Sequence, residues 1–175
     1  MKKLILAFVI MALQITCYGQ HPKVRNFDKD TYKGGNQIWQ IAQDKAGNMI
    51  FANTGILSYD GTEWTLTHTD NRTTVRSLLY DHESERLYYG AANEFGYTCI
   101  DEENRKSHKA LTEGINVTME DIWAIHKIGS DLWLRENTNI YCYDFQSIKQ
   151  YSFQDKVSCS AVTGQKLLIF VNNHG

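Results

Sequence analysis

The sequence predicts an all-β protein made of β-propeller blades, with about three and a half four-stranded blades forming an incomplete propeller. The first observation behind this prediction is a repeat. Trp39 and Trp123 are 84 residues apart, and so are Asp60 and Asp144, which gives 42 residues per copy if two copies fill the interval. The second is that each copy holds short apolar or alternating runs divided by turn residues, which is typical of strands and hairpins. A period of about 40 to 45 residues matches one four-stranded propeller blade.

The repeats indicate the order of elements along the chain. We expect a signal peptide at 1–19, an N-terminal lead-in at 20–35, and blades near 36–70, 71–115, 116–152 and 153–175, the last one truncated. A sandwich or a barrel also uses short strands, but neither requires repetition at this interval, so the repeat favours blades around an axis. No window shows a sustained helical stripe, because the best candidate, residues 111–125, contains Gly114 and several β-branched residues.

The number of repeats predicts an open ring. Residues 36–175 hold about 3.3 copies of 42 residues, whereas propellers close with roughly four to eight blades. An open ring exposes the unpaired backbone groups of its last strand and the apolar flank of its last blade. We therefore expect residues 20–175, expressed alone, to be insoluble or oligomeric.

The first 19 residues have the pattern of a secretory signal peptide. Lys2 and Lys3 precede an apolar run of 10 residues, which is shorter than the ~20 that a membrane-spanning helix needs. Cys17 and Gly19 are small residues placed for cleavage, so the mature chain is expected to begin at Gln20. An uncleaved anchor and acylation at Cys17 are the alternatives.

Three cysteines remain in the mature chain: Cys99, Cys142 and Cys159. Their spacings do not match a CxxC zinc or redox motif, so we interpret them as buried apolar thiols on strands. Cys99 and Cys142 fall near the ends of equivalent strands in neighbouring copies. We expect no disulfide between them, because repetition alone explains their alignment.

Composition and motifs exclude several kinds of chemistry. The formal net charge is −2, with no cluster of basic residues, so we expect this segment to contact no nucleic acid. The six histidines lack metal-binding spacings, and no nucleophile elbow, P-loop or dinucleotide fingerprint is present, so we expect no metal, cofactor or catalytic residue. The acidic residues that recur between copies are interpreted as turn residues that bond their own backbone: Asp44, Asp60, Asp81, Asp101 and Asp144.

Two sets of aromatic residues invite a functional interpretation. Trp39 and Trp123 occupy equivalent repeat positions, which favours packing between blades over stacking on sugar rings. The better functional candidate is an irregular segment in the second copy that inserts residues relative to the first. Insertions in a blade map to loops on one face, often the binding face. We therefore predict ligand binding by Asn93, Glu94, Phe95 and Tyr97.

Some of these residues also carry a family resemblance. The pattern Ile-Trp-x-Ile-x-x-Asp-x-x-Gly-Asn at 38–48, followed by 55–64, resembles the two-component regulator propeller repeat. The segments 35–39 and 93–97 are similar to the N-terminal region of large Bacteroidetes regulators. The resemblance covers residues 21–175. It departs from the repeat where 82–86 replaces the usual glycine turn, and where the third copy has Lys127 and no acidic turn residue.

A further stretch resembles a motif of enzymes with the same architecture. Residues 58–64 are similar to the Asp box of sialidase propellers, although one residue is missing between the aspartate and the glycine. Asp boxes stabilise turns and lie away from the active site, so this stretch favours a blade over catalysis.

The family resemblance implies a function and a set of partners. In such regulators the propeller is followed by a triple-tyrosine β-sandwich, a membrane helix and a cytoplasmic output module, which is a histidine kinase or a helix-turn-helix protein. The chain is then a non-catalytic sensor segment on the periplasmic side of the inner membrane, in a transmembrane transcription regulator. Its expected partners are a carbohydrate-derived or other envelope ligand, the remaining blades and downstream domains, and a second copy in a homodimer. The alternatives are an exported propeller hydrolase or lyase, and a structural propeller that mediates dimerisation.

Overall fold

The computed structural model describes residues 24–100 and 106–173. The signal peptide at 1–19, its cleavage position and the turn residue Asp101 lie outside the described residues. Within them the chain is almost entirely β, apart from the four-residue helix α2 (Lys29–Tyr32) in the lead-in. No helix in this part of the chain has the length and hydropathy needed to cross a bilayer.

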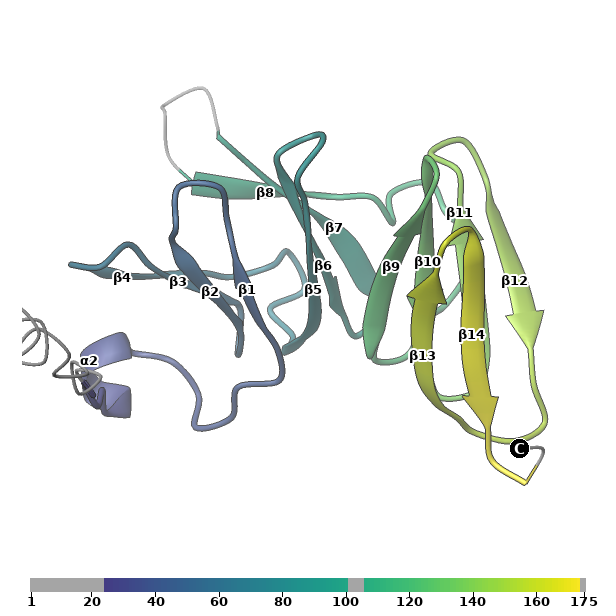
Figure 1. The fold of residues 1–175 in the computed structure, drawn as a ribbon, viewed down its shortest axis with the longest axis horizontal. Coiled ribbons are helices and arrows are strands. Elements are labelled where there is room, and N and C mark those ends of the chain that lie inside the picture. Colours follow the sequence, from purple (N-terminus) through teal and green to yellow (C-terminus); the bar gives the residue numbers. More distant parts are fainter. Residues whose placement is uncertain (1–23, 101–105, 174–175) are drawn as a thin grey trace, which may run out of the picture.

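Three four-stranded antiparallel sheets follow one another along the chain, as predicted for propeller blades (Figure 1). In each sheet the strands pair in chain order. The first sheet contains β1 (Ile41–Gln43), β2 (Met49–Ala52), β3 (Ile56–Tyr59) and β4 (Trp64–Thr67). The second contains β5 (Val75–Asp81), β6 (Arg86–Ala91), β7 (Glu94–Ile100) and β8 (Lys106–Ala110). The third contains β9 (Ala124–Ile128), β10 (Asp131–Arg135), β11 (Asn139–Tyr143) and β12 (Ile148–Ser152).

A two-stranded hairpin follows the third sheet. It consists of β13 (Val157–Thr163) and β14 (Lys166–Val171), and it lies beside the third sheet in yellow in Figure 1. The first strands of successive units are neighbours, because β1 contacts β5, β5 contacts β9, and β9 contacts β13. The four units are therefore arranged side by side through their first strands, which is the arrangement of propeller blades around an axis.

Two apolar clusters hold the sheets together. One lies between the first and second sheets, and its buried members are Ile50, Ala52, Ile56, Val75, Leu78, Leu87, Tyr89 and Ala91. The other lies between the second and third sheets, and its buried members are Tyr88, Phe95, Met119, Ile122, Ile125, Leu132, Leu134, Tyr141 and Tyr143. Strand β10 alternates buried and half-buried residues, as a strand with one face on a core does. Truncating a buried leucine in such a cluster costs about 2–5 kcal/mol.

The second and third units approach closely at Gly90 on β6. A Cβ atom built there would lie 2.6 Å from Ser77 Oγ and 2.7 Å from Ile122 Cγ2. Ser77 Oγ also donates a hydrogen bond of 2.7 Å to the carbonyl of Ile122. Only glycine fits this position, because any side chain would push the segment that enters the third sheet away from the second.

The recurring aspartates stabilise turns, as the sequence predicted. Asp44 accepts a hydrogen bond from the backbone N–H of Asn48 at 2.9 Å. Asp60 and Asp144 each accept two, from residues two and three positions further on. Asp81 accepts one from the N–H of Glu83 at 3.3 Å. The stretch that resembles an Asp box contains Asp60, and it forms the turn between β3 and β4.

The lead-in packs on the outer part of the first sheet through aromatic rings. The centroid of Phe27 lies 5.1 Å from that of Trp64 on β4, and the centroid of Tyr32 on α2 lies 5.7 Å from it. Trp64 also stacks on Tyr59 at 4.6 Å. These contacts attach residues outside the repeats to the first blade.

The three described cysteines are free and lie on strands β7, β11 and β13. The expectation that all three are buried is wrong for Cys159, which is exposed, while Cys99 and Cys142 are half-buried. Cys159 lies on β13, most of whose residues are exposed. Cys99 lines a cleft of about 530 Å³ between the first and second sheets.

Candidate functional site

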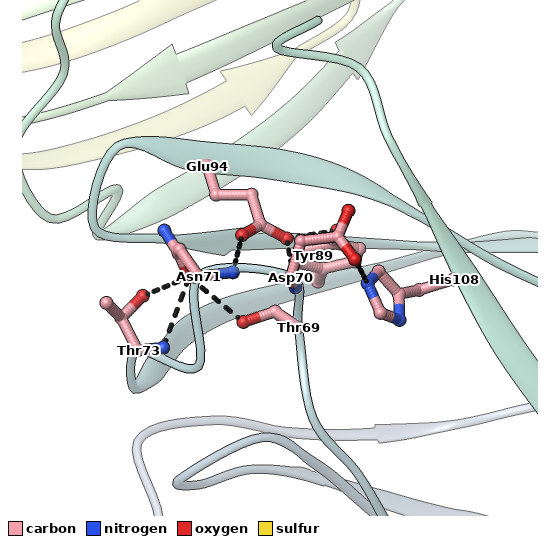
Figure 2. Close-up of polar contacts among 7 residues, drawn as sticks. All are labelled: Thr69, Asp70, Asn71, Thr73, Tyr89, Glu94 and His108. Atoms are coloured by element: carbon pink, nitrogen blue, oxygen red, sulfur yellow. Dashed lines mark hydrogen bonds and ion pairs between the residues drawn. The ribbon is translucent and has the colours of Figure 1, made fainter.

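Glu94, one of the four predicted site residues, lies at the start of β7 and is only 3% exposed. Its Oε1 accepts hydrogen bonds from Tyr89 Oη at 2.7 Å and from the N–H of Asp70 at 3.3 Å. Its Oε2 accepts one from the N–H of Asn71 at 2.9 Å. Figure 2 shows that the carboxylate thereby fastens the segment between β4 and β5 to the second sheet.

Corresponding residues of the other two sheets do the same. Asn53 and Glu136 follow the second strand of their own sheets and are 0% and 1% exposed. Asn53 Nδ2 donates to the carbonyl of Gly35 at 2.9 Å, and Glu136 Oε1 accepts from the N–H of Glu120 at 2.5 Å. In each case one buried polar side chain holds the segment that enters its sheet. Such groups must be hydrogen-bonded because burying them without partners is costly.

Two further polar groups lie next to Glu94. His108 on β8 places its Nε2 3.1 Å from Asp70 Oδ1. One side-chain oxygen or nitrogen atom from each of Asp70, Glu94 and His108 lies within 4.8 Å of the others. The side chain of Asp70 is 74% exposed, while that of His108 is 11% exposed. Burial, and then the bond to the Glu94 carboxylate, raise the pKa of Tyr89, so its phenol remains a donor.

The other predicted site residues face different surroundings. Asn93 is exposed, and its Oδ1 accepts a hydrogen bond from the N–H of Met119 at 2.9 Å. Phe95 is fully buried with its ring 5.2 Å from that of Tyr143. Tyr97 is half-buried. These three side chains and Glu94 therefore do not converge on one cavity, and their role in ligand binding stays a prediction.

The expectation that residues 93–97 form an irregular insertion is wrong. Glu94–Ile100 is the regular strand β7, and Ala91 pairs with Glu94 across a turn of two residues. Asn93 adopts φ 54° in this turn, a left-handed conformation that asparagine tolerates better than most residues. A turn of two residues suffices for the connection, so no loop extends from the blade here.

A second cluster lies where the first strands of the sheets begin. The guanidinium carbon of Arg76 lies 4.2 Å from the ring centroid of Trp39 and 5.0 Å from that of Trp123. The two indole rings contact each other edge to face at 5.6 Å. Arg76 also forms an ion pair of 3.2 Å with Asp121. Both tryptophans therefore pack as predicted, but around an arginine from the sheet between them.

Sequence reasoning missed Arg76, although the repeat contains a signal for it. Arg76 follows Val75 as Trp39 follows Ile38 and as Trp123 follows Ile122. The pairing of β5 with β6 shifts register between Val75 and Ser77, and a bulge of this kind re-aims the side chain it contains. This irregularity brings the guanidinium against both indoles.

The cluster borders a polar hollow. Trp39 is 39% exposed, and it lines a cavity of about 360 Å³ together with Gly35, Asn36, Gln37, Thr54 and Thr74. Arg76 Nε and Trp123 Nε1 are buried and have no hydrogen-bond partner within the described part of the chain. An exposed indole beside amides and hydroxyls is suited to a polar ligand with an apolar face.

Within the described residues the chain is therefore an all-β protein built from propeller-like blades, and both clusters lie where successive blades meet. No protein-family model matches the chain, and no curated protein matches it. Two solved structures of the extracellular domain of BT4673 from B. thetaiotaomicron share its fold. One, from a proposed one component system, has a TM-score of 0.59 and 20% identity. The other, from a proposed hybrid two component system, has a TM-score of 0.58 and 21% identity.

The extent of this likeness is uneven. The matches cover 78% of this chain but 19% of each BT4673 domain, so the chain spans about a fifth of the length of these neighbours. At this identity the likeness concerns the fold.

Proposed function

We propose that the chain is a non-catalytic sensor segment, exported to the periplasmic side of the inner membrane, within a transmembrane transcription regulator. The fold likeness to the extracellular domains of BT4673 supports this proposal. The resemblance of residues 38–48 and 55–64 to the regulator propeller repeat supports it independently. Ligand binding to such a segment is transmitted through the rest of the regulator.

The observation that carries the ligand proposal is the partly exposed Trp39 at the polar hollow. An indole presents a flat apolar surface on which the C–H face of a sugar ring can stack. The amides of Asn36 and Gln37 and the hydroxyls of Thr54 and Thr74 supply donors and acceptors around it. The guanidinium of Arg76 packs against the indole, 4.2 Å from its ring centroid. The chemistry is therefore that of a carbohydrate-derived ligand.

Binding is tested with a panel of neutral pentasaccharides, by isothermal titration calorimetry and tryptophan fluorescence on the full chain. We expect at least one sugar to bind, and Trp39→Ala to abolish its binding. The matched control is Trp133→Ala, because Trp133 stacks on Tyr151 in the third sheet, away from the hollow. A sugar that binds wild type and Trp39→Ala equally would contradict the site, and no binding by any sugar would contradict the ligand class.

We also propose that further β-structure of the same regulator covers the hairpin β13–β14. Leu168 and Phe170 on β14 are 53% and 46% exposed, and Val162 on β13 is 38% exposed. Large apolar side chains gathered on one element indicate a surface that pairs with other protein. The remaining blades and downstream domains, and a second copy in a homodimer, are the partners that the sensor function requires.

A further inference from the structure

We infer that Asp70, Glu94 and His108 form a binding site for one Zn²⁺ ion. The three side chains come from the segment between β4 and β5, from the start of β7 and from β8, and Figure 2 shows them side by side. One ligand atom of each lies within 4.8 Å of the others. One ion would draw these three atoms closer together, and the Asp70 side chain, at 74% exposed, is free to move toward the other two. This site is independent of the sugar site proposed above.

The donor set fits zinc. Zn²⁺ binds imidazole nitrogen at ~2.0–2.1 Å and carboxylate oxygen at ~2.0–2.2 Å, and three protein ligands leave a fourth position for water. Two carboxylates balance the charge of a divalent cation. His108 Nε2 now faces Asp70 Oδ1 at 3.1 Å, so the ion would replace that contact and bind both atoms. Mg²⁺ fits less well, because it prefers six oxygen ligands.

The Glu94 carboxylate is already held in place for this role. Tyr89 Oη and the N–H of Asn71 donate to its two oxygens. With the longer bond from the N–H of Asp70 it accepts three hydrogen bonds, whereas a carboxylate offers about four acceptor sites. A ligand whose orientation is fixed by outer hydrogen bonds loses little freedom when the ion binds.

In the first and third sheets, the segment that enters the sheet is held without residues equivalent to Asp70 and His108. Asn53 and Glu136 hold the corresponding segments without such a pair. Across residues 24–100 and 106–173, the group of Asp70, Glu94 and His108 is the one set of three such side chains close enough to share an ion. His108 and the Asp70 carboxylate next to Glu94 are thus additional to the repeated structural contact, and metal binding accounts for their presence.

The exposure of the three residues provides a path for the ion. Glu94 is 3% exposed and the His108 side chain 11%, while the Asp70 side chain is 74% exposed and forms the entrance. His108 Nδ1 is buried and has no hydrogen-bond partner among the described residues, so Nε2 is the ring nitrogen that faces the other two side chains. A bound ion would tie the segment between β4 and β5 to β7 and β8, and so fix the second sheet relative to the first.

The experiment adds ZnCl₂ to the metal-free full chain and measures both binding, by isothermal titration calorimetry, and the melting temperature. We expect one ion per chain and a melting temperature that rises with Zn²⁺ concentration, because an ion that binds the folded state stabilises it by mass action. MgCl₂ at the same concentrations should leave the melting temperature unchanged.

Variants assign the site. His108→Ala and Asp70→Ala should each weaken zinc binding by more than about 100-fold, since losing even an outer partner costs about 10–100-fold. The control His82→Ala removes an exposed histidine of the same sheet and should bind like wild type. Each variant is compared with its own metal-free melting temperature, so a purely structural effect of the substitution is separated from the loss of the zinc increment. Absence of binding to wild type, or equal binding by His108→Ala and His82→Ala, would overturn the inference.

Discussion

Lys127 Nζ lies 2.7 Å from Asp81 Oδ2, and this ion pair joins the first strands of the second and third sheets. Lys127 also reaches Glu83 Oε2 at 3.1 Å. The Asp81 side chain is 7% exposed and that of Lys127 23%, so the pair is largely shielded from water. The third copy lacks the acidic turn residue of the repeat, and its lysine instead binds the turn aspartate of the preceding sheet.

This pair predicts an acid-sensitive step in stability. Burial raises the pKa of Asp81, but hydrogen bonds from Lys127 and Ser84 outweigh it and lower the pKa from 3.8 to about 2. A carboxyl whose pKa is depressed in the folded state stabilises that state above its unfolded pKa. We therefore expect a stability contribution that is fully present above pH 3.8 and is lost as the pH falls toward about 2.

The measurement is urea unfolding from about pH 5 to about pH 2. Asp81→Asn should flatten the decline in unfolding free energy over this window. The control Asp30→Asn alters an exposed carboxyl on α2 and should follow wild type. An Asp81→Asn variant with the same decline as wild type would show that another group controls the acid limb.

Glu94→Gln should destabilise the fold. The carboxylate accepts three hydrogen bonds, and an amide in its place turns an N–H₂ group toward at least one of these donors. A buried donor left unsatisfied costs about 1–3 kcal/mol, and we expect that loss in chemical denaturation with chelator present. Glu113→Gln, at an exposed position, should stay within about 0.5 kcal/mol of wild type. Equal losses in both variants would refute the structural role of Glu94.

Arg76→Lys should loosen the aromatic cluster. Lysine keeps the positive charge but lacks the flat guanidinium that stacks against Trp39 and Trp123. We expect a loss of about 1 kcal/mol in unfolding free energy and altered tryptophan emission. Arg72→Lys, an exposed substitution, serves as the control. Unchanged emission of Arg76→Lys would mean that the stacked contact does not persist in solution.

The three described thiols should react with iodoacetamide in a set order. Cys159 is exposed and should react first. Burial raises the pKa of Cys142, and the carboxylates of Asp131 and Asp144 add to the effect, so little thiolate forms there and it should react last. Mass spectrometry over time gives the order. Labelling of Cys142 before Cys159, or a disulfide in the unreduced protein, would contradict the structure.

The exposed face of the hairpin predicts self-association. Leu168 and Phe170 present large apolar surfaces on β14, and we expect the chain alone to form concentration-dependent oligomers. Size-exclusion chromatography with light scattering measures this. Replacing both residues by lysine should shift the population toward monomer, whereas a wild-type chain that is monomeric at all concentrations would refute the prediction.

Predictions from local pattern and from repetition had different outcomes. The turn role of Asp44, Asp60, Asp81 and Asp144 was correct, because a short carboxylate and the backbone it bonds are within a few residues of each other. The segment 93–97 was misread as an insertion. Aligning the copies by sequence could not show that Asn93 turns the chain within two residues, since its left-handed backbone is a property of the folded hairpin.

The candidate sites mark the limit of what the sequence alone reveals. The sequence by itself determined the four-stranded repeat, because strand periodicity and turn chemistry act over neighbouring residues. Only the tertiary structure brought Asp70, Glu94 and His108 together, and placed Arg76 between two tryptophans from other sheets. The repeat marks Arg76 as equivalent in position to Trp39 and Trp123, but it does not encode the contacts themselves. These depend on how successive sheets pack through their first strands and on one bulge in β5.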